Sequence, residues 1–475
     1  MEWYLLLLIP FFIILIITIR TIQFKPVIYP EMEKKHDIDE KRVVKSLSKM
    51  LQFKTVSNLD ETKVDKEIFE QFRQYVKDRY PKIFEVGTYS QHHAGMLIKI
   101  QGESSEFPIV LMSHYDVVSA VGNWKHDPFS GKISDTHVYG RGALDTKSSL
   151  NAVMESVEYA LLHGKIFRND LYLAFSGDEE VFGPSAPAIK NHLKDLGIKP
   201  YMVLDEGGAI VAKMFPGVIK KCAVVGIAEK GFMNLKMTVL SKGGHASTPP
   251  KHTPVTELSK AVTKLNNHPA FKLKMTVPVR SLFNTIAPYS KSLPIKILFA
   301  NLWLFMPLVK LIAKTTGGEF LSMFKTTQAF TLASGSDAIN VLPSVATIGV
   351  NYRLRPGETS EDILKKVKRI VNNPNILLEI TGVSEATSTS LVDDAYQMIR
   401  KAINLTWPEV IAAPYLMVAT SDSRHYHEIC EHVYKFSPMD VSRVDLAKIH
   451  GIDEDISIDN VVKGVNFYLN LIDQL

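Results

Sequence analysis

Between residues 37 and 231, patterns typical of strands alternate with patterns typical of helices. Short apolar runs bounded by polar residues or glycine predict strands, and apolar residues at intervals of three and four predict helices. Strand-like runs cover 108–112, 171–175 and 201–204, and helical spacing covers 150–161. Strands that alternate with helices predict an α/β fold, in which helices flank both faces of a mostly parallel sheet.

A different pattern runs from residue 232 to residue 382. Apolar and polar residues alternate from Leu235 to Val239, as in a half-buried strand. Thr253 followed by Pro254 is a typical helix start, and 359–362 resembles a capping box before a second helix. We therefore expect an antiparallel sheet with helices on one face, inserted as an α+β domain into the first domain. The first domain resumes at residue 383 and ends, at residue 475, in an amphipathic helix.

The stretch from 293 to 311 is unusually apolar. Two lysines, an asparagine and a proline interrupt it, which argues against a membrane span here. We favour a buried helical excursion of the inserted domain. The alternative is an apolar surface for an acyl chain, a partner subunit or a bilayer.

The first twenty residues are also apolar. From Trp3 to Ile19 only Thr18 is polar, and Arg20 comes next, which is near the lower length limit for a membrane-spanning helix. A cleaved signal peptide typically starts with basic residues and ends at a small-residue site, but here Glu2 precedes the run. We expect a single-pass transmembrane anchor or signal-anchor over 1–20 and a linker over 21–36. Basic residues on the C-terminal flank favour a cytosolic position for that flank, so the orientation stays open.

Composition excludes some functions. The net charge of +5 is small for 475 residues, and no basic run carries interleaved aromatic residues, so we expect no nucleic-acid partner. Two cysteines, Cys222 and Cys430, are enough for one disulfide or none. An Asn-Leu-Thr sequon at Asn404 is a weak indication of lumenal exposure.

Five side chains that bind metals well occur where the chain is expected to leave the sheet. They are His114, Asp145, Glu180, Asp205 and His450. In α/β sheets, ligands bind beyond the carboxyl ends of the strands, where several of these residues fall. Two histidines and three carboxylates are sufficient for two zinc ions if one carboxylate bridges them.

Two further acids complete the predicted chemistry. Asp116 follows His114 by two residues and is placed to accept a hydrogen bond from its second ring nitrogen, which fixes the tautomer. Glu179 stands beside Glu180 and is free to act as a base. It would take a proton from a metal-acidified water and pass it to the leaving amine. The set predicts a hydrolase.

Each of these residues alone has a simpler explanation. Glu179 would be a solvated surface acid, and His450 a turn residue. His245, in the segment GGHAS, would cap or pack, and Arg353 and Arg424 would form weak surface ion pairs. Only the combined set and its position at strand ends favour a metal site.

The motifs resemble those of the di-zinc exopeptidase and aminoacylase family, which includes carboxypeptidase S, aminoacylase and glutamate carboxypeptidase. Within it, the chain is most similar to N-fatty-acyl-amino-acid synthase/hydrolases and carboxypeptidase S. The resemblance spans about residues 40 to 475, through AEKGFMNL, GGHASTPP, LWLFMPL, INVLP, TSDSRHY and KIHGIDEDIS.

The resemblance implies a zinc exopeptidase-like fold and two zinc ions. One ion would lie on His114, Asp145 and Asp205, with Glu206 as the reserve for Asp205. The other would lie on Asp145, Glu180 and His450. The resemblance also implies Glu179 as the base, Asp116 as the residue that orients His114, and a cis peptide after the bridging aspartate.

For the inserted domain, the resemblance implies a ferredoxin-like lid and dimerisation domain over 232–382, and hence a possible homodimer. His245 would stabilise the oxyanion. Asn340 and Arg424 would hold the carboxylate of the substrate, with Arg353 as a lesser candidate. The anchor would place the catalytic domain on the extracytoplasmic or lumenal side.

We therefore predict a zinc-dependent amide hydrolase. It would release a terminal amino acid from a short peptide or an N-acyl amino acid, including N-fatty-acyl ones, in a reaction that is reversible in principle. The alternative is a catalytically silent, membrane-tethered binding protein of the same fold.

Overall fold

The computed structural model describes residues 3–29, 32–268 and 271–475. Residues 1 and 2 of the predicted anchor, and residues 30 and 31 of the predicted linker, lie outside the described residues.

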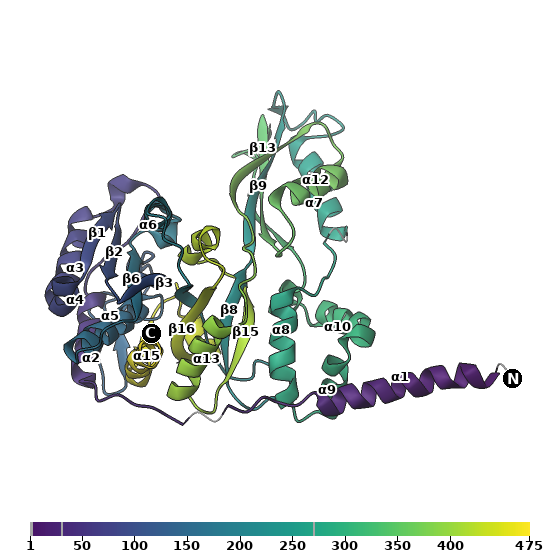
Figure 1. The fold of residues 1–475 in the computed structure, drawn as a ribbon. Helices are drawn as coiled ribbons and strands as arrows, with labels where there is room; N and C mark the ends of the chain where they lie inside the picture. The colour runs from purple at the N-terminus through teal and green to yellow at the C-terminus, as the bar shows by residue number, and fades with distance from the viewer. Residues whose placement is uncertain (1–2, 30–31, 269–270) are drawn as a thin grey trace.

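Eight strands form the main sheet (Figure 1). Its central pairs, β6–β3, β3–β7 and β7–β16, are parallel, as is β8–β15, whereas β1, β2 and β6 pair antiparallel. The predicted α/β fold with a mostly parallel sheet is therefore confirmed. The strands in spatial order are β1 (Thr88–His92), β2 (Gly95–Ile100), β6 (Asn169–Ser176), β3 (Ser104–His114), β7 (Met202–Val211), β16 (Val433–Val441), β8 (Cys222–Glu229) and β15 (Ile411–Met417).

Helices cover both faces of this sheet, because the apolar runs of its central strands place apolar side chains on both faces. Along β3, Ile109 and Leu111 face one core, whereas Val110 and Met112 face the other. The first core is covered by α2 (Glu40–Leu51), α3 (Lys66–Arg79), α4 (Pro81–Val86), α5 (Lys147–Leu162), α13 (Asp394–Thr406) and α15 (Ile458–Ile472). The second is covered by α6 (Ser185–Asp195).

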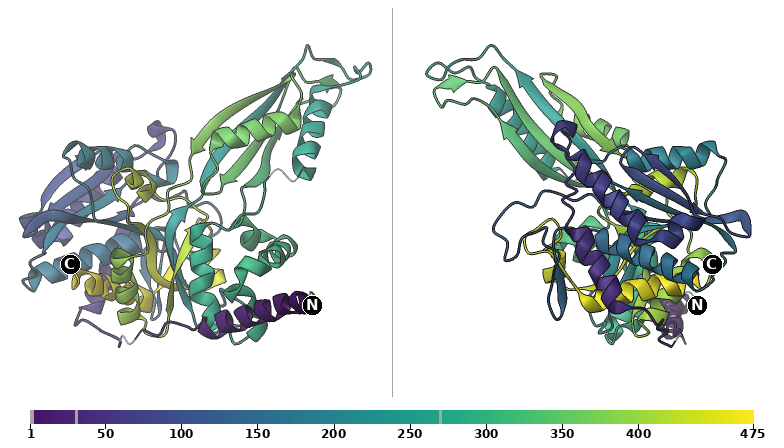
Figure 2. Two further views of the ribbon diagram at one scale, coloured as in Figure 1. Left: turned by 45° about the vertical axis from the view of Figure 1, so that its right-hand side comes forward. Right: turned by 90° about the vertical axis from the view of Figure 1, so that its left-hand side faces the viewer.

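A second, four-stranded antiparallel sheet projects from the main body (Figure 2). The predicted alternation is present in β9, where Met233, Leu235, Met237 and Val239 are buried. Both predicted helix starts are confirmed as capping boxes, at Thr253 and Thr359. The strands, in order, are β11 (Thr327–Ser334), β13 (Val345–Leu354), β9 (Gly231–Leu240) and β14 (Ile376–Ser384), and the helices over one face are α7 (Pro254–Asn267) and α12 (Ser360–Val371).

The apolar excursion packs on the main sheet and not on the second sheet, contrary to our expectation. Phe283 and Phe299 share a core with Val224 of β8 and Ala413 of β15. The physical reason is that β8 and β15 present an apolar outer face that no other helix covers among the described residues. The elements of the excursion are α8 (Val277–Ile286), α9 (Leu293–Ala300), α10 (Leu302–Thr316) and α11 (Gly318–Ser322).

Helix α1 (Trp3–Gln23) extends away from the body, and its C-terminal end lies beside α9 (Figure 1). Among the helices that the structure describes, none is by itself long and apolar enough to cross a membrane. Helices α9 and α10 reach that length and hydropathy only together, with a bend of 115° between them.

Three side chains were considered above as indications of a disulfide or of lumenal exposure. Cys222 and Cys430 are buried and free. Asn404 is 3% exposed, and its side-chain amide donates a hydrogen bond to the carbonyl of Val410 at 2.8 Å. The sequon is therefore inaccessible to modification in the folded chain, and it gives no support for lumenal exposure.

Candidate active site

Asp145 lies between two histidines that are far apart in the sequence. Its Oδ1 is 3.1 Å from Nε2 of His114, and its Oδ2 is 3.0 Å from Nε2 of His450. His114 is the last residue of β3, and His450 follows the short helix α14 (Arg443–Leu446). Both oxygens of one carboxylate thus point at different imidazoles, which is the geometry of a bridging ligand.

Each histidine has a second carboxylate beside it. Glu206 Oε1 lies 3.2 Å from Nε2 of His114, and Glu180 Oε2 lies 3.1 Å from Nε2 of His450. The result is two neighbouring sets of one imidazole and two carboxylates, with Asp145 common to both. We call His114, Asp145, Glu180, Glu206 and His450 the cluster.

The predicted ligand Asp205 is not in the cluster, and our choice of Asp205 over Glu206 needs correction. Asp205 is buried, and its Oδ2 accepts a hydrogen bond from the backbone N–H of Ser423 at 2.9 Å. Successive side chains of a strand point to opposite faces. Asp205 and Glu206 are neighbours in β7, so only Glu206 faces His114.

Asp116 organises the other side of the cluster. Its oxygens accept hydrogen bonds from the backbone N–H groups of Glu179 and Glu180, each at 3.1 Å. Nδ1 of His114 lies 3.3 Å from Asp116 Oδ1 and 3.0 Å from its backbone carbonyl oxygen. One buried carboxylate therefore orients both the imidazole and the short helix η2 (Glu179–Val181) that carries the two glutamates.

Charge crowding shifts the pKa values of these acids. Burial raises the pKa of Glu179 well above its ordinary value, and the charges of Asp422 and Glu206 add to this rise. Burial, together with Asp145 and Asp205, raises the pKa of Glu206 to about 7. Crowded carboxylates resist ionisation in this way unless a cation lies among them.

The donor set fits a metal ion. Ligand atoms of His114, Asp145 and Glu180 lie within 4.8 Å of one another, and so do those of His114, Glu179 and Glu206. Oε1 of Glu180 is buried and has no hydrogen-bond partner. An unpartnered buried carboxylate oxygen beside imidazole nitrogens is a position that a divalent cation would satisfy.

Glu454 holds the turn that presents Asp145, and the sequence reasoning missed it. Its buried carboxylate accepts hydrogen bonds from the backbone N–H groups of Gly142, Leu144 and Asp145, at 2.7–3.2 Å. Arg141 Nη1 donates to it at 2.7 Å. The only sequence signal was an acid in the same motif as His450.

The Asp145–Thr146 peptide is cis, as the resemblance implied.

Of the predicted substrate residues, Arg424 lies near the cluster. It follows Ser423 in the short helix η4 (Asp422–Glu428), and Nη1 donates to the carbonyl of Ser421 at 3.1 Å. Its guanidinium lies 5.0 Å from the ring of Phe182, directly after η2. Arg424 is therefore on the same side of the molecule as Glu179.

Arg353 is connected to Arg424 through two aromatic rings, those of Phe182 and Phe232. The rings of Phe182 and Phe232 are 5.3 Å apart, and the guanidinium of Arg353 is 6.0 Å from the ring of Phe232. The two arginines thus flank an aromatic pair that joins the main body to the base of the second sheet.

His245 and Asn340 are not brought to the cluster. They lie at the far end of β9, where β10 (Gly244–His245) pairs with β12 (Val341–Leu342), and both residues are exposed. The ring Nδ1 of His245 accepts a hydrogen bond from the backbone N–H of Ser247 at 3.1 Å. Ten strand residues separate this end from the main sheet, which corresponds to about 30 Å.

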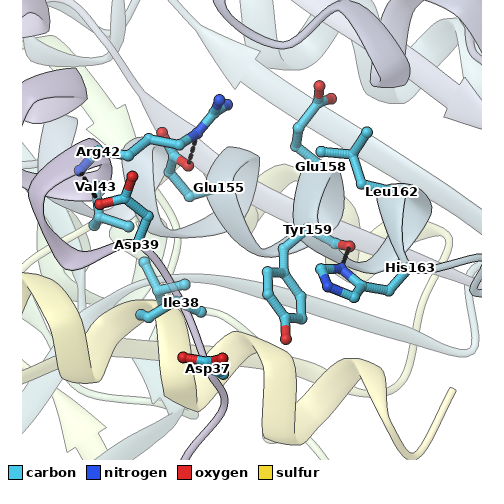
Figure 3. Close-up of a pocket in the computed structure, with 11 residues that line it drawn as sticks. Asp37, Ile38, Asp39, Arg42, Val43, Glu155, Glu158, Tyr159, Leu162 and His163 are labelled. Atoms are coloured by element: carbon cyan, nitrogen blue, oxygen red, sulfur yellow. Dashed lines mark hydrogen bonds and ion pairs between the residues drawn. The ribbon is translucent and has the colours of Figure 1, made fainter.

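A separate cavity of about 250 Å³ lies between α2, α5 and α15 (Figure 3). None of its lining residues belongs to the cluster. Its two glutamates already have protein partners, since Glu155 pairs with Arg42 at 3.0 Å and Glu158 accepts from the backbone N–H of Ile83. The cavity is therefore not a competing active site.

Two known proteins are similar to this chain over most of its length. The chain is 35% identical over 443 residues to the probable carboxypeptidase S-like 2 of Dictyostelium discoideum, covering 90% of this chain and 83% of that protein. It is 30% identical over 442 residues to the N-fatty-acyl-amino acid synthase/hydrolase PM20D1 of Xenopus tropicalis, covering 91% and 86%.

Among solved structures, the fold resembles the M20 family metallo-carboxypeptidase Sso-CP2 from Sulfolobus solfataricus. The TM-score is 0.67 at 17% identity, and the match covers 90% of this chain and 98% of that chain. Human carnosine dipeptidase 1 matches with a TM-score of 0.61 at 14% identity, covering 92% and 97%. At these identities the likeness supports the fold alone.

Residues 110–474 match the family described as Peptidase family M20/M25/M40. This region contains the whole cluster, together with Glu179 and Asp116. The chain therefore belongs to peptidase family M20/M25/M40, and it is a hydrolase.

Proposed function

We propose that the protein is a zinc-dependent amide hydrolase that releases a terminal amino acid from an N-acyl amino acid or a short peptide. The observation that supports it most is the contact of the two Asp145 oxygens with His114 and His450. Shared carboxylates of this kind hold pairs of metal ions.

In this proposal His114, Asp145 and Glu206 would hold one zinc ion, and Asp145, Glu180 and His450 would hold the other. Zinc ions held there would polarise the scissile carbonyl and acidify water. Glu206 takes the place expected for Asp205, because only Glu206 approaches His114.

Glu179 is the base. It is fixed through its backbone N–H by Asp116, and it stands beside the cluster without being one of its members. It takes a proton from the attacking water and returns it to the amide nitrogen as the C–N bond breaks. The products are a carboxylic acid and a free amino acid. The reverse order of the same proton transfers would condense the two.

Arg424 binds the terminal carboxylate of the substrate, since a guanidinium forms paired hydrogen bonds with a carboxylate. His245 and Asn340 act from the second sheet, as oxyanion donor and carboxylate ligand. Both are remote from the cluster in this conformation, so they require closure of the second sheet or a second copy of the chain. A homodimer through this sheet would supply them.

Residues 1–20 anchor the protein in a membrane, with the catalytic domain on the extracytoplasmic or lumenal side. Support comes from the apolar sequence of α1 and from its projection away from the body. The relatives named as N-fatty-acyl-amino acid synthase/hydrolases favour a fatty acyl group in the substrate.

Turnover of a long-chain N-acyl amino acid and of a dipeptide by the zinc-loaded full chain tests the proposal. We expect hydrolysis that chelators abolish and that Glu179→Gln removes while zinc remains bound. Zinc binding without turnover of either substrate would instead support a catalytically silent binding protein of the same fold.

A further inference from the structure

Helix α10 exposes a continuous apolar stripe. Its buried side packs Val309 and Ala313 against the core beneath β8 and β15. On the other side, residues spaced as on one helical face are open to solvent. The exposed apolar side chains are Trp303, Leu304, Leu308, Leu311 and Ile312, with exposures between 38% and 57%.

The charged residues of α9 and α10 are all basic. Between residues 291 and 318 the chain contains four lysines and no aspartate or glutamate. Residues 3–29, which include α1, contain Arg20 and Lys25 and again no acid. An apolar surface with a basic border complements an anionic lipid headgroup layer above a hydrocarbon core.

Specific polar contacts fix the base of α1 beside this surface. Arg20 Nε donates to the carbonyl of Ala300 at 3.0 Å, and the buried Asn301 donates through Nδ2 to Thr21 Oγ1 at 3.2 Å. Residues 300 and 301 form the bend between α9 and α10. Helix α1 and the α9–α10 bend are therefore one structural unit, although almost 280 residues separate them.

The exposure of the apolar side chains of α1 also indicates contact with a lipid bilayer. Its apolar side chains are open to solvent on several sides, among them Ile9, Phe11, Phe12, Ile14 and Ile19. A second protein copy would cover one face of such a helix, whereas hydrocarbon covers all of them. Trp303 and the lysines of α10 are residue types that favour the interfacial layer of a bilayer.

We infer that α9 and α10 form a second membrane-contacting element, which lies in the interfacial layer of an anionic bilayer beside the base of α1. Trp303, Leu308 and Leu311 enter the acyl region, and Lys310 and Lys314 reach the headgroups. This holds the α8–α10 side of the main domain against the lipid. The inference rests on the membrane anchor proposed for α1, and it does not depend on the proposed hydrolysis.

Quenching of tryptophan fluorescence by lipids with brominated acyl chains tests the inference in the full chain. The chain has four tryptophans, Trp3, Trp124, Trp303 and Trp407. A Trp3→Phe background removes the signal of α1. In vesicles of phosphatidylcholine and phosphatidylserine, we expect bromolipid quenching in this background, and its loss when Trp303→Phe is added.

A matched pair of charge substitutions isolates the stripe. Leu308→Glu with Leu311→Glu is expected to reduce the Trp303-dependent quenching by more than half, because buried charge is unfavourable in the acyl region. Leu196→Glu, at a residue 61% exposed after α6, is expected to leave it unchanged. All positions are exposed, so each variant should fold, which circular dichroism checks.

Vesicle-bound protein without any Trp303-dependent quenching would overturn the inference. If, in addition, Leu311→Cys cross-linked two copies of the chain in the vesicles, the stripe would be assigned to a subunit interface. Equal loss of quenching in Leu196→Glu would also overturn it, because the effect would then not be local to α10.

Discussion

The Nε2 atoms of His114 and His450 face opposite oxygens of one carboxylate, at 3.1 Å and 3.0 Å from Asp145. This relationship makes Asp145 different from every other member of the cluster, because it alone contacts both histidines.

Removal of the shared carboxylate should therefore affect both ions. We expect Asp145→Asn to lose most of its bound zinc, whereas His450→Ala should retain about half, since His450 faces only one position. Elemental analysis after dialysis against buffer with trace zinc measures the stoichiometry. Equal zinc content in the two variants would contradict a bridging role.

Glu179→Gln should abolish turnover without loss of metal. The amide cannot accept and return a proton, so we expect kcat to fall by about two to four orders of magnitude. Glu61→Gln, at a side chain 84% exposed, is the matched control and should retain activity. Retained turnover in Glu179→Gln at full zinc occupancy would rule out this base.

Glu206→Gln and Asp205→Asn should separate the two neighbouring acids. Glu206 faces His114, so its loss should weaken zinc affinity by about tenfold to a hundredfold. Asp205 instead accepts from the Ser423 N–H, so its variant should perturb η4 and keep both ions. Competition titration against a chelator gives both affinities. The reverse order would restore Asp205 as the ligand.

Glu454→Gln should destabilise the fold. The buried Glu454 pairs with the buried Arg141 and accepts three backbone hydrogen bonds, and loss of one partner of such a pair costs about 3–5 kcal/mol. The surface pair of Asp459 and Lys463, with side chains 69% and 30% exposed, provides the control, since Asp459→Asn should cost less than about 1 kcal/mol. Chemical denaturation of the metal-free proteins measures both, and similar losses would contradict a structural role for Glu454.

Lys230 should make stability depend on pH. Burial, with the charges of Arg353 and Arg355, lowers its pKa from 10.5 to about 8, and its Nζ donates to the carbonyls of Ser322 and Lys325. Between these two pKa values the unfolded chain holds a proton that the folded chain has released. The folded state therefore gains stability as pH rises through this range, by about 3 kcal/mol in total.

Comparison with Lys230→Met, which lacks this titration, isolates the effect. The unfolding free energy of the parent should rise relative to the variant between about pH 8 and about pH 10. A difference that does not change with pH would show that Lys230 titrates alike in both states.

Much of the fold was predictable because local patterns and burial agree. The apolar runs of β3, β6 and β7, the alternation in β9 and the capping boxes at Thr253 and Thr359 each arise from neighbouring residues in the chain. The packing of α8 and α9 on β8 and β15 was not predictable in this way. An apolar helix fits any apolar face, and the choice depends on which face other elements leave uncovered.

The sequence by itself determined which chemistry is available: two histidines, several carboxylates and one spare glutamate at the ends of strands. Only the tertiary structure decided that Glu206 and not Asp205 reaches His114, that Glu454 supports the turn of Asp145, and that His245 lies far from the cluster. The reason is that side-chain direction along β7 and contacts between distant segments are properties of the folded backbone. The residue type at a single position does not specify the direction of its side chain or its contacts with distant segments.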